Sequence, residues 1–155
     1  MTKLSGITTV PLSEVPKEGM MESGQPYRPL IMVVDDECAI ADSLAEILKR
    51  TGYRTKATYD GNSALDMALL TPPDMIITDV MLPGMNGIEL GITMRRIYPD
   101  CKVLLFSGSA STTPMLEAAT RTGHNFVLLT KPVHPTEMLA CVSEFMRPRR
   151  EAATA

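Results

Sequence analysis

Four hydrophobic runs along this 155-residue chain each end in a polar or charged residue. They are Val33-Val34-Asp35-Asp36, Ile76-Ile77-Thr78-Asp79, Leu104-Leu105-Phe106-Ser107 and Leu128-Leu129-Thr130-Lys131, and the more polar stretch Arg54-Thr55-Lys56-Ala57 completes a set of five. Continuous apolar runs are typical of parallel strands that are covered on both faces. Ligands of open α/β sheets bind outside the carboxyl ends of such strands. The runs therefore predict one sheet edge that collects three carboxylates, one hydroxyl and one ammonium.

Amphipathic segments alternate with these runs and predict five helices. Apolar residues recur at helical spacing across residues 38–51, 64–69, 88–97, 114–121 and 135–146. Gly52 and Gly123 suit helix ends, and Pro72 and Pro99 prevent two of the helices from continuing. Strands that alternate with helices of this length indicate repeated βαβ units. The sequence thus predicts a (βα)5 domain with a parallel sheet.

Composition restricts the class of protein. A hydrophobic content of 45% with 21% charged residues is typical of a soluble globular protein, and the net charge of -3 argues against a nucleic-acid-binding surface over the whole molecule. The three cysteines form no CxxC pair, which favours a reducing compartment over disulfides or zinc. The chain shows neither a signal-peptide pattern nor the ~20 apolar residues of a membrane span. We therefore expect a cytoplasmic protein without direct nucleic-acid or membrane contacts.

The pattern divides the chain into three predicted parts. Residues 1–29 are rich in proline and glycine without a sustained apolar period, so they predict a flexible leader. A short strand or docking peptide around Ile7–Leu12 remains an alternative for part of this leader. Residues 30–146 form the predicted domain, and residues 147–155 are too short for anything but a tail.

Two of the strand ends carry the carboxylates. The adjacent Asp35 and Asp36 repel each other unless a cation, usually Mg²⁺, shares them, although a turn with a helix N-cap is equally consistent with the pair. Asp79 precedes a loop rich in proline and glycine, which leaves its carboxylate exposed above the sheet edge. Such a carboxylate can attack phosphorus as an oxygen nucleophile and form an aspartyl phosphate. The alternative is a simple turn aspartate.

The other two strand ends carry a hydroxyl and an ammonium. Ser107 can hydrogen-bond a phosphoryl oxygen, and Gly108 leaves space beside it, although Ser-Gly is also a common loop dipeptide. The Lys131 ammonium would be costly to bury unpaired, so we expect it to pair with Asp79 or with a phosphoryl group there. Pro132 leaves open whether the preceding peptide bond is cis.

Together these motifs resemble the receiver domain of two-component response regulators, and in particular the chemotaxis-Y-like receivers that consist of one domain. The matching residues are Asp35-Asp36, Asp79 with Pro83 and Gly87 behind it, Ser107-Gly108 and Lys131-Pro132. The resemblance covers residues 30–146. It implies a flavodoxin-like, doubly wound α/β fold, with strand order 2-1-3-4-5 and helices on both faces of the sheet.

The resemblance also implies a metal-dependent phosphoacceptor site. Asp79 would accept a phosphoryl group from a phosphohistidine on a sensor histidine kinase or a phosphotransfer protein. Asp36, Asp79 and the backbone carbonyl of Met81 would bind Mg²⁺ or Mn²⁺ directly, and Asp35 would hold a metal-bound water. Lys131 would pair first with Asp79 and then with its phosphate.

By the same resemblance, Ser107 would bind a phosphoryl oxygen and so shift a preexisting conformational equilibrium. The family commonly has Tyr or Phe three residues before the lysine, where this chain has Leu128, and Phe126 lies on the same face of the predicted strand. The switch therefore either uses an aliphatic residue or is coupled differently to the output surface. Met81, two residues after Asp79, is predicted to slow self-dephosphorylation because it is bulky and apolar.

The main interpretation is a stand-alone phosphorelay switch, a phosphoprotein that catalyses at most its own phosphorylation and dephosphorylation. It would act on a partner protein through its fourth helix, fifth strand and fifth helix, and a phosphorylation-dependent homodimer stays open. A receiver-fold interaction module that works without phosphorylation is the alternative, but the complete set of site residues disfavours it. An enzyme is disfavoured too. A phosphatase would need a second aspartate at Met81, and a flavin protein a phosphate-binding loop where Asp35 and Asp36 lie.

Overall fold

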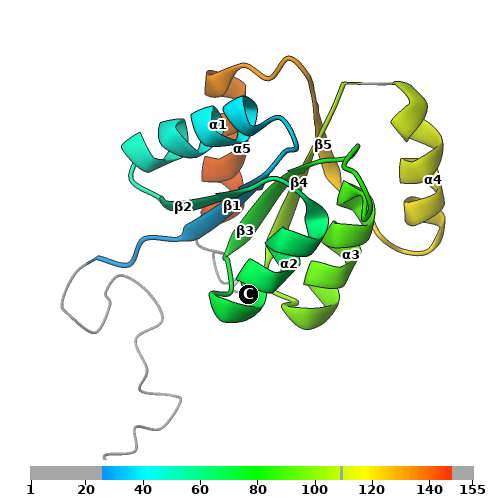
Figure 1. The fold of residues 1–155 in the computed structure, drawn as a ribbon, viewed down its shortest axis with the longest axis horizontal. Helices are drawn as coiled ribbons and strands as arrows, with labels where there is room; N and C mark the ends of the chain where they lie inside the picture. The colour runs from blue at the N-terminus through cyan, green and yellow to red at the C-terminus, as the bar shows by residue number, and fades with distance from the viewer. Residues whose placement is uncertain (1–25, 109, 148–155) are drawn as a thin grey trace, which may run out of the picture.

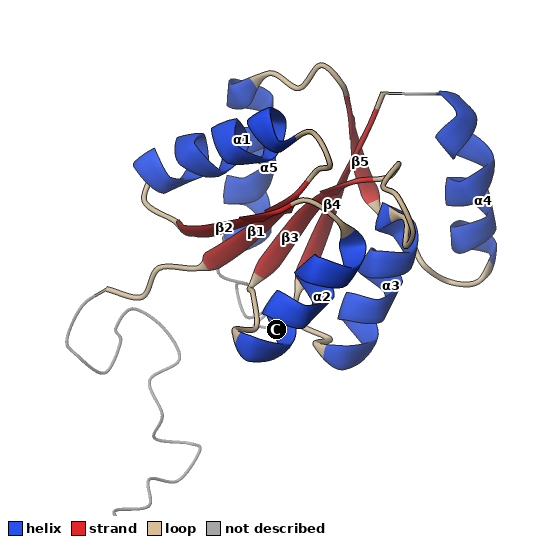
Figure 2. Cartoon of the chain, in the orientation of Figure 1, coloured by secondary structure: helices blue, strands red, loops and turns tan. Residues whose placement is uncertain are grey.

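The computed structural model describes residues 26–108 and 110–147, and they form an alternating α/β structure (Figures 1 and 2). A short 3-10 turn, η2, precedes the fourth helix. The elements in chain order are β1 (Leu30–Val34), α1 (Cys38–Arg50), β2 (Arg54–Thr58), α2 (Gly61–Leu70), β3 (Met75–Asp79), α3 (Gly87–Ile97), β4 (Lys102–Ser107), η2 (Ala110–Thr112), α4 (Thr113–Arg121), β5 (Val127–Thr130) and α5 (Pro135–Met146).

The five strands form one parallel sheet in the order β2-β1-β3-β4-β5. Helices α1 and α5 cover one face of this sheet, and α2, α3 and α4 lie on the other (Figure 1). The strand order reverses between β1 and β3, and the carboxyl ends of strands at such a reversal form the ligand crevice of doubly wound sheets. The predicted fold class and strand order are confirmed.

Two hydrophobic cores, one on each face, arise from the alternation of side chains along the strands. In β1, Ile31 and Val33 face α1 and α5, whereas Met32 and Val34 face α2 and α3. The same alternation continues through β3 and β4, and every residue of β1 and β3 is buried. The strands are therefore rigidly held, and their carboxyl ends offer a fixed platform for polar side chains.

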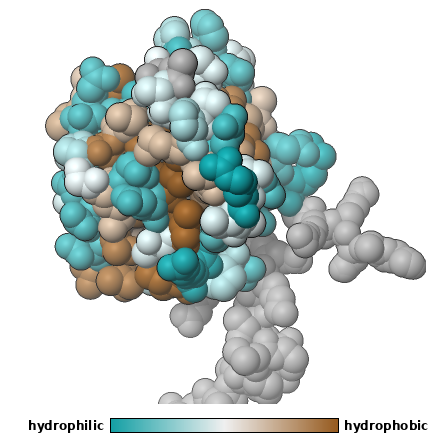
Figure 3. Space-filling view, turned by 90° about the vertical axis from the view of Figure 1, so that its right-hand side faces the viewer, coloured by the Kyte–Doolittle hydropathy of each residue, from teal (hydrophilic) through white to brown (hydrophobic). Residues whose placement is uncertain are grey.

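Helix α4 and strand β5 are packed less tightly than the rest of the fold. Ala119 is the one buried residue of α4, and Val127 and Leu128 of the edge strand β5 are 45% and 36% exposed. Apolar surface is visible between polar side chains in Figure 3, which looks onto the side of the molecule that carries α4. Segments with few buried contacts open at low free-energy cost, so α4 is suited to move.

Residues 27–29 are hydrogen-bonded to the domain just before β1. The Tyr27 hydroxyl and the Leu30 amide both donate to Oδ2 of Asp74, and the Arg54 amide donates to the Pro29 carbonyl at 2.9 Å. Packing therefore begins a few residues before the predicted domain boundary at residue 30. Most of the predicted leader, including Ile7–Leu12, and most of the tail lie outside the described residues. No helix within 26–108 or 110–147 is long and apolar enough to cross a bilayer.

Candidate phosphoacceptor and metal site

Three carboxylates lie together where β1 and β3 end. Val34 pairs with Thr78 in the sheet, so Asp35 and Asp79 leave the two neighbouring strands side by side. Oxygen atoms of Asp35, Asp36 and Asp79 all lie within 4.8 Å of one another. Asp35 and Asp79 are buried, with 1% and 7% exposure, whereas Asp36 is exposed. The prediction that the loop leaves the Asp79 carboxylate exposed is therefore wrong, because the loop folds back over it. The structure thus brings together the three acidic residues that the sequence predicts at one edge.

Lys131 joins two of these carboxylates. Its Nζ donates to Oδ2 of Asp79 at 2.9 Å and to Oδ2 of Asp35 at 2.8 Å. Its backbone amide donates to the Ser107 carbonyl at 2.9 Å, which fixes the lysine beside β4, and the bond to Pro132 is cis. Burial alone would lower the pKa of Lys131, but hydrogen bonds and charges from the two aspartates outweigh it and raise that pKa. The lysine is therefore a stable cation at neutral pH.

The loop after Asp79 folds back over this residue. The Met81 amide donates to Oδ1 of Asp79 at 3.1 Å, and the Gly87 amide donates to the Val80 carbonyl at 2.9 Å. A Cβ atom on Gly87 would lie 2.1 Å from the Asp79 carbonyl oxygen, so only glycine fits there. Gly84 supplies a left-handed turn with φ 74°. Both carboxylate oxygens of Asp79 therefore have a donor, one from its own loop and one from Lys131.

The charges of the site fit a divalent cation. Three carboxylates face one ammonium, which leaves an excess of negative charge in a small space. Within the described residues, Asp36 forms no hydrogen bond or ion pair, so its oxygens are available as ligands. Hard oxygen donors of this kind are the ones that Mg²⁺ and Mn²⁺ prefer. Asp36 and Asp79 could hold such an ion. That the Met81 backbone carbonyl also binds it stays a prediction.

Asp35 also has a role in the local turn. Its Oδ1 accepts a hydrogen bond from the Glu37 amide at 2.9 Å, and Glu37 is the N-cap residue of α1. The sequence left a turn and a cation site as two alternatives for Asp35 and Asp36. The geometry is compatible with both, because one oxygen of Asp35 supports the turn and the other faces Lys131.

The buried hydroxyl of Ser107 already has a hydroxyl partner at the start of α4. Its Oγ lies 2.7 Å from Oγ1 of Thr112, and the two residues are 4% and 2% exposed. Gly108 lies beside the stem of Lys131, where an added Cβ would still make ordinary contacts. The hydroxyl predicted to bind phosphate is thus linked to the turn that precedes α4.

Phe126 is the aromatic residue that lies directly before the start of β5. Its ring packs against the core on the α3 side, and the Arg95 guanidinium lies 4.1 Å from the ring centroid. Gly91 of α3 makes room for the ring, because a Cβ there would lie 3.0 Å from it. Leu128 is partly exposed. The aromatic ring is therefore anchored on α3, whereas the predicted switch position holds a loosely packed leucine.

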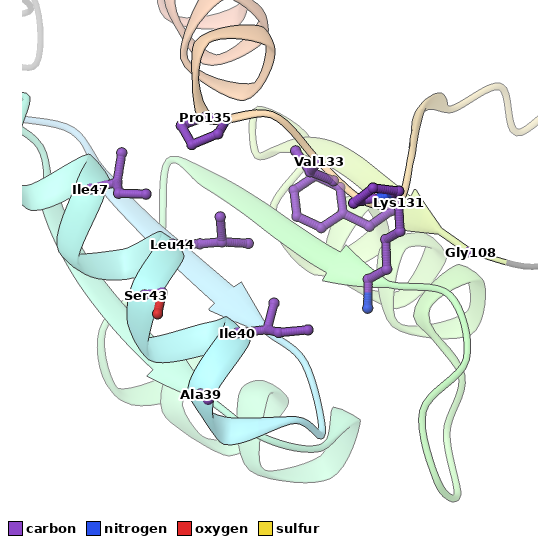
Figure 4. Close-up of a pocket in the computed structure, with 11 residues that line it drawn as sticks. Ala39, Ile40, Ser43, Leu44, Ile47, Gly108, Lys131, Val133 and Pro135 are labelled. Carbon is purple, nitrogen blue, oxygen red and sulfur yellow. The ribbon is translucent and has the colours of Figure 1, made fainter.

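An apolar groove of about 640 Å³ opens beside the site (Figure 4). Ile40, Leu44 and Ile47 extend into it from α1, opposite Val133 in the loop before α5. Lys131 lines the end of the groove nearest the carboxylates. A protein that inserts apolar side chains here would lie close to Asp79.

Sequence reasoning missed three partners in this region. The sequence predicts Asp79, or a phosphoryl group on it, as the partner of Lys131, and does not predict the bridge to Asp35. Thr112 and Arg95 were not singled out, because spacing alone does not show which hydroxyl or cation meets Ser107 or Phe126. A hydroxyl five residues beyond the strand end was the available signal for Thr112.

Comparison with known proteins gives one consistent result. Residues 31–143 match the response regulator receiver domain family. A CheY-like response regulator receiver domain protein from Methanospirillum hungatei JF-1 is 27% identical, with a TM-score of 0.69 over 76% of this chain and 93% of that one. The chemotaxis response regulator CheY4 of Vibrio cholerae is 25% identical (TM-score 0.67, 77% and 100% covered), and the NtrX receiver domain of Brucella abortus is 26% identical (0.67, 77% and 99%).

Proposed function

This chain belongs to the response regulator receiver domain family, and from that premise we propose that it accepts a phosphoryl group on Asp79 from a phosphohistidine donor. The observation that carries the proposal is the position of Asp79 at the end of β3, with Lys131 bound to one oxygen and two further carboxylates within 4.8 Å. Receiver domains of two-component systems act in signalling by accepting phosphoryl groups. The residues of this chain supply the groups that such a transfer needs.

In the proposed reaction, a carboxylate oxygen of Asp79 attacks phosphorus as the nucleophile. The new P–O bond forms while the P–N bond to the donor histidine breaks, and its electron pair stays on the imidazole nitrogen. Lys131 then exchanges its contact with Asp79 for one with a phosphoryl oxygen, and Ser107 donates to another. Asp79 is 7% exposed, and its low exposure to water makes these charge interactions stronger.

The proposed metal requirement is based on the charges of the site. Asp36 and Asp79 would hold Mg²⁺ or Mn²⁺ with the Met81 carbonyl, and Asp35 would hold a metal-bound water. When bound, the ion offsets the negative charge that builds up on the phosphoryl oxygens. Lys131 alone cannot balance three carboxylates and a phosphoryl group. We therefore propose that phosphorylation requires the divalent ion.

We further propose that the chain works as a switch in the cytoplasm, and not as an enzyme with turnover of external substrates. Capture of a phosphoryl oxygen by Ser107 would shift the position of the turn before α4 and change the surface formed by α4, β5 and α5. A downstream protein, or a second copy of the chain, would read that surface. The exposed apolar residues Val127 and Leu128 support this assignment.

The apolar groove between α1 and the loop before α5 is the proposed contact for the phosphohistidine-bearing protein. It opens beside Lys131, where the donor phosphoryl group must be delivered. Ser43→Arg, an exposed substitution in the groove wall, should slow transfer from a phosphorylated phosphotransfer protein and leave phosphorylation by acetyl phosphate unchanged. Equal rates from the protein donor with and without Ser43→Arg would rule out this contact.

The proposed function is tested by incubation with acetyl phosphate and Mg²⁺, followed by intact-mass measurement. We expect the wild-type chain to gain one phosphoryl group, and Asp79→Ala or removal of the metal with EDTA to abolish that gain. Asp66→Ala, an exposed carboxylate on α2, is the matched control and should leave the gain intact. Absence of an adduct would favour a phosphorylation-independent interaction module, and rapid hydrolysis of phosphate esters would favour an enzyme.

A further inference from the structure

We propose that Thr112 is a positioning residue that holds the Ser107 hydroxyl away from phosphoryl capture in the unphosphorylated chain. The proposal deepens the proposed function and rests on it, because Ser107 must leave this partner to bind a phosphoryl oxygen. The two hydroxyl oxygens lie 2.7 Å apart, and both residues are almost completely buried. One of these hydroxyls therefore donates to the other in a site from which water is excluded.

The bond joins two elements that are packed to different degrees. Ser107 ends β4, which pairs on both sides within the sheet, whereas Thr112 ends η2 and is the N-cap residue of α4. Threonine at an N-cap usually accepts a hydrogen bond from the first turn of its own helix. In this chain the Thr112 side chain makes no such cap bond and contacts Ser107 instead. The Thr112 hydroxyl therefore links the start of α4 to the end of β4.

Release of this bond would free the start of α4. Ala119 is the one buried residue of the helix, so its contacts with the rest of the fold are few. The Ser107 hydroxyl has one hydrogen to donate. To give that hydrogen to a phosphoryl oxygen, the Ser107 side chain must turn toward Asp79, and this rotation breaks the contact with Thr112 whichever hydroxyl donates in it. Binding of the phosphoryl group by Ser107 at the sheet edge would thus loosen the attachment of α4 to the sheet.

The proposal predicts a specific pattern among variants. Thr112→Val keeps the shape but removes the hydroxyl, and Thr112→Ser keeps the hydroxyl. Beryllofluoride with Mg²⁺, which mimics the phosphoryl group, should bind Thr112→Val about three- to tenfold more tightly, as expected for loss of one competing hydrogen bond. Thr112→Ser should bind as the wild type does. Thr113→Val, at the exposed neighbouring threonine, is the matched control and should also bind as the wild type does.

Hydrogen exchange gives a second readout that a merely structural role would not reproduce. Amides of α4 should exchange faster in the wild type when beryllofluoride is added, and Thr112→Val should show the fast exchange without it. Ser107→Ala should produce the same fast exchange, and adding Thr112→Val to it should have no further effect. The double variant tests whether the two hydroxyls act through one shared bond.

Unchanged or weaker beryllofluoride binding by Thr112→Val, with wild-type exchange in α4, would overturn the role of Thr112. That outcome is distinct from failure of the proposed function, in which the wild-type chain itself would bind no beryllofluoride and gain no phosphoryl group. Additive effects of Ser107→Ala and Thr112→Val on exchange would equally contradict the proposal, because they would show that the two hydroxyls act independently.

Discussion

The Lys131 ammonium lies 2.9 Å from Oδ2 of Asp79, although 52 positions separate the two residues in the chain. The second contact of Lys131, to Asp35, means that one cation connects the ends of β1, β3 and β5. This bridge places one positive charge between two buried carboxylates and joins them. The same ammonium is then in position to meet a phosphoryl group added to Asp79.

Replacement of this cation should affect both chemistry and stability. In Lys131→Met the two buried carboxylates lose their cationic partner, so we expect a loss of about 2 kcal/mol in the free energy of unfolding and a much slower reaction with acetyl phosphate. Because the pKa of Lys131 is raised in the folded chain, its contribution is complete below the ordinary lysine pKa of ~10.4 and is lost only above it.

Urea unfolding of the wild type and Lys131→Met checks this expectation. The difference between them should be the same at pH 7 and pH 9, since the lysine is charged at both values in either state. Lys131→Arg keeps the charge but not the shape and serves as a comparison. A difference that disappears by pH 9 would show that the ion pair does not carry the stability.

Met81 should control the lifetime of the phosphorylated state. Its side chain is 49% exposed at the edge of the site, so a substitution there costs little packing. Met81→Asn should accelerate hydrolysis of the phosphoprotein severalfold, because a polar amide can hold the attacking water. Met81→Leu preserves the apolar character and should leave the rate unchanged. The check is loss of the phosphoryl group over time by intact mass, and equal rates for the wild type and Met81→Asn would refute the idea.

The Phe126 ring should contribute more to stability than Leu128. Phe126 packs on α3 under Arg95, so Phe126→Leu should lower the free energy of unfolding by about 1–2 kcal/mol through lost packing and the lost cation–π contact. Leu128→Ala removes a partly exposed side chain and should cost less, about 1 kcal/mol or below. Denaturant unfolding measures both, and a larger loss for Leu128→Ala would show that the switch position is the better packed of the two.

Gly87 is expected to be indispensable for a steric reason. An added Cβ would lie 2.1 Å from the Asp79 carbonyl oxygen, so Gly87→Ala must displace the loop and should cost about 3 kcal/mol or more. Gly84→Ala is the comparison, because Gly84 has a positive φ but open space around it, and about 1 kcal/mol is expected. Thermal unfolding should rank the two in this order, and the reverse ranking would contradict the crowding at Gly87.

The fold was predictable because the sequence patterns that define it, apolar runs and helix-ending residues, are local and recur along the chain. Buried parallel strands read as apolar runs, and the observed ends of β3 at Asp79 and of β4 at Ser107 fall where those runs stop. Helix boundaries followed from glycine and proline, as at Pro135. The predicted residues gathered at one edge for the same reason, since every parallel strand delivers its last residue there.

The contacts that depend on side-chain direction could not be predicted. The sequence does not show that Lys131 reaches Asp35 as well as Asp79, because strand order does not fix the direction of the lysine side chain. It does not show that the Ser107 hydroxyl meets Thr112, because the path of the chain after β4 is not periodic. The packing of Phe126 on Gly91 likewise depends on how closely α3 approaches the sheet.

Chemical mapping of the phosphoryl group tests the central claim most directly. Borohydride reduces an aspartyl phosphate to homoserine, so the phosphorylated chain can be reduced, digested and sequenced by mass spectrometry. We predict homoserine at position 79 in the wild type, none there in Lys131→Met treated for the same short time, and aspartate at positions 35 and 36 throughout. Homoserine at another position, or aspartate retained at 79 in a chain that carries a phosphoryl group, would contradict the assignment of Asp79 as the acceptor.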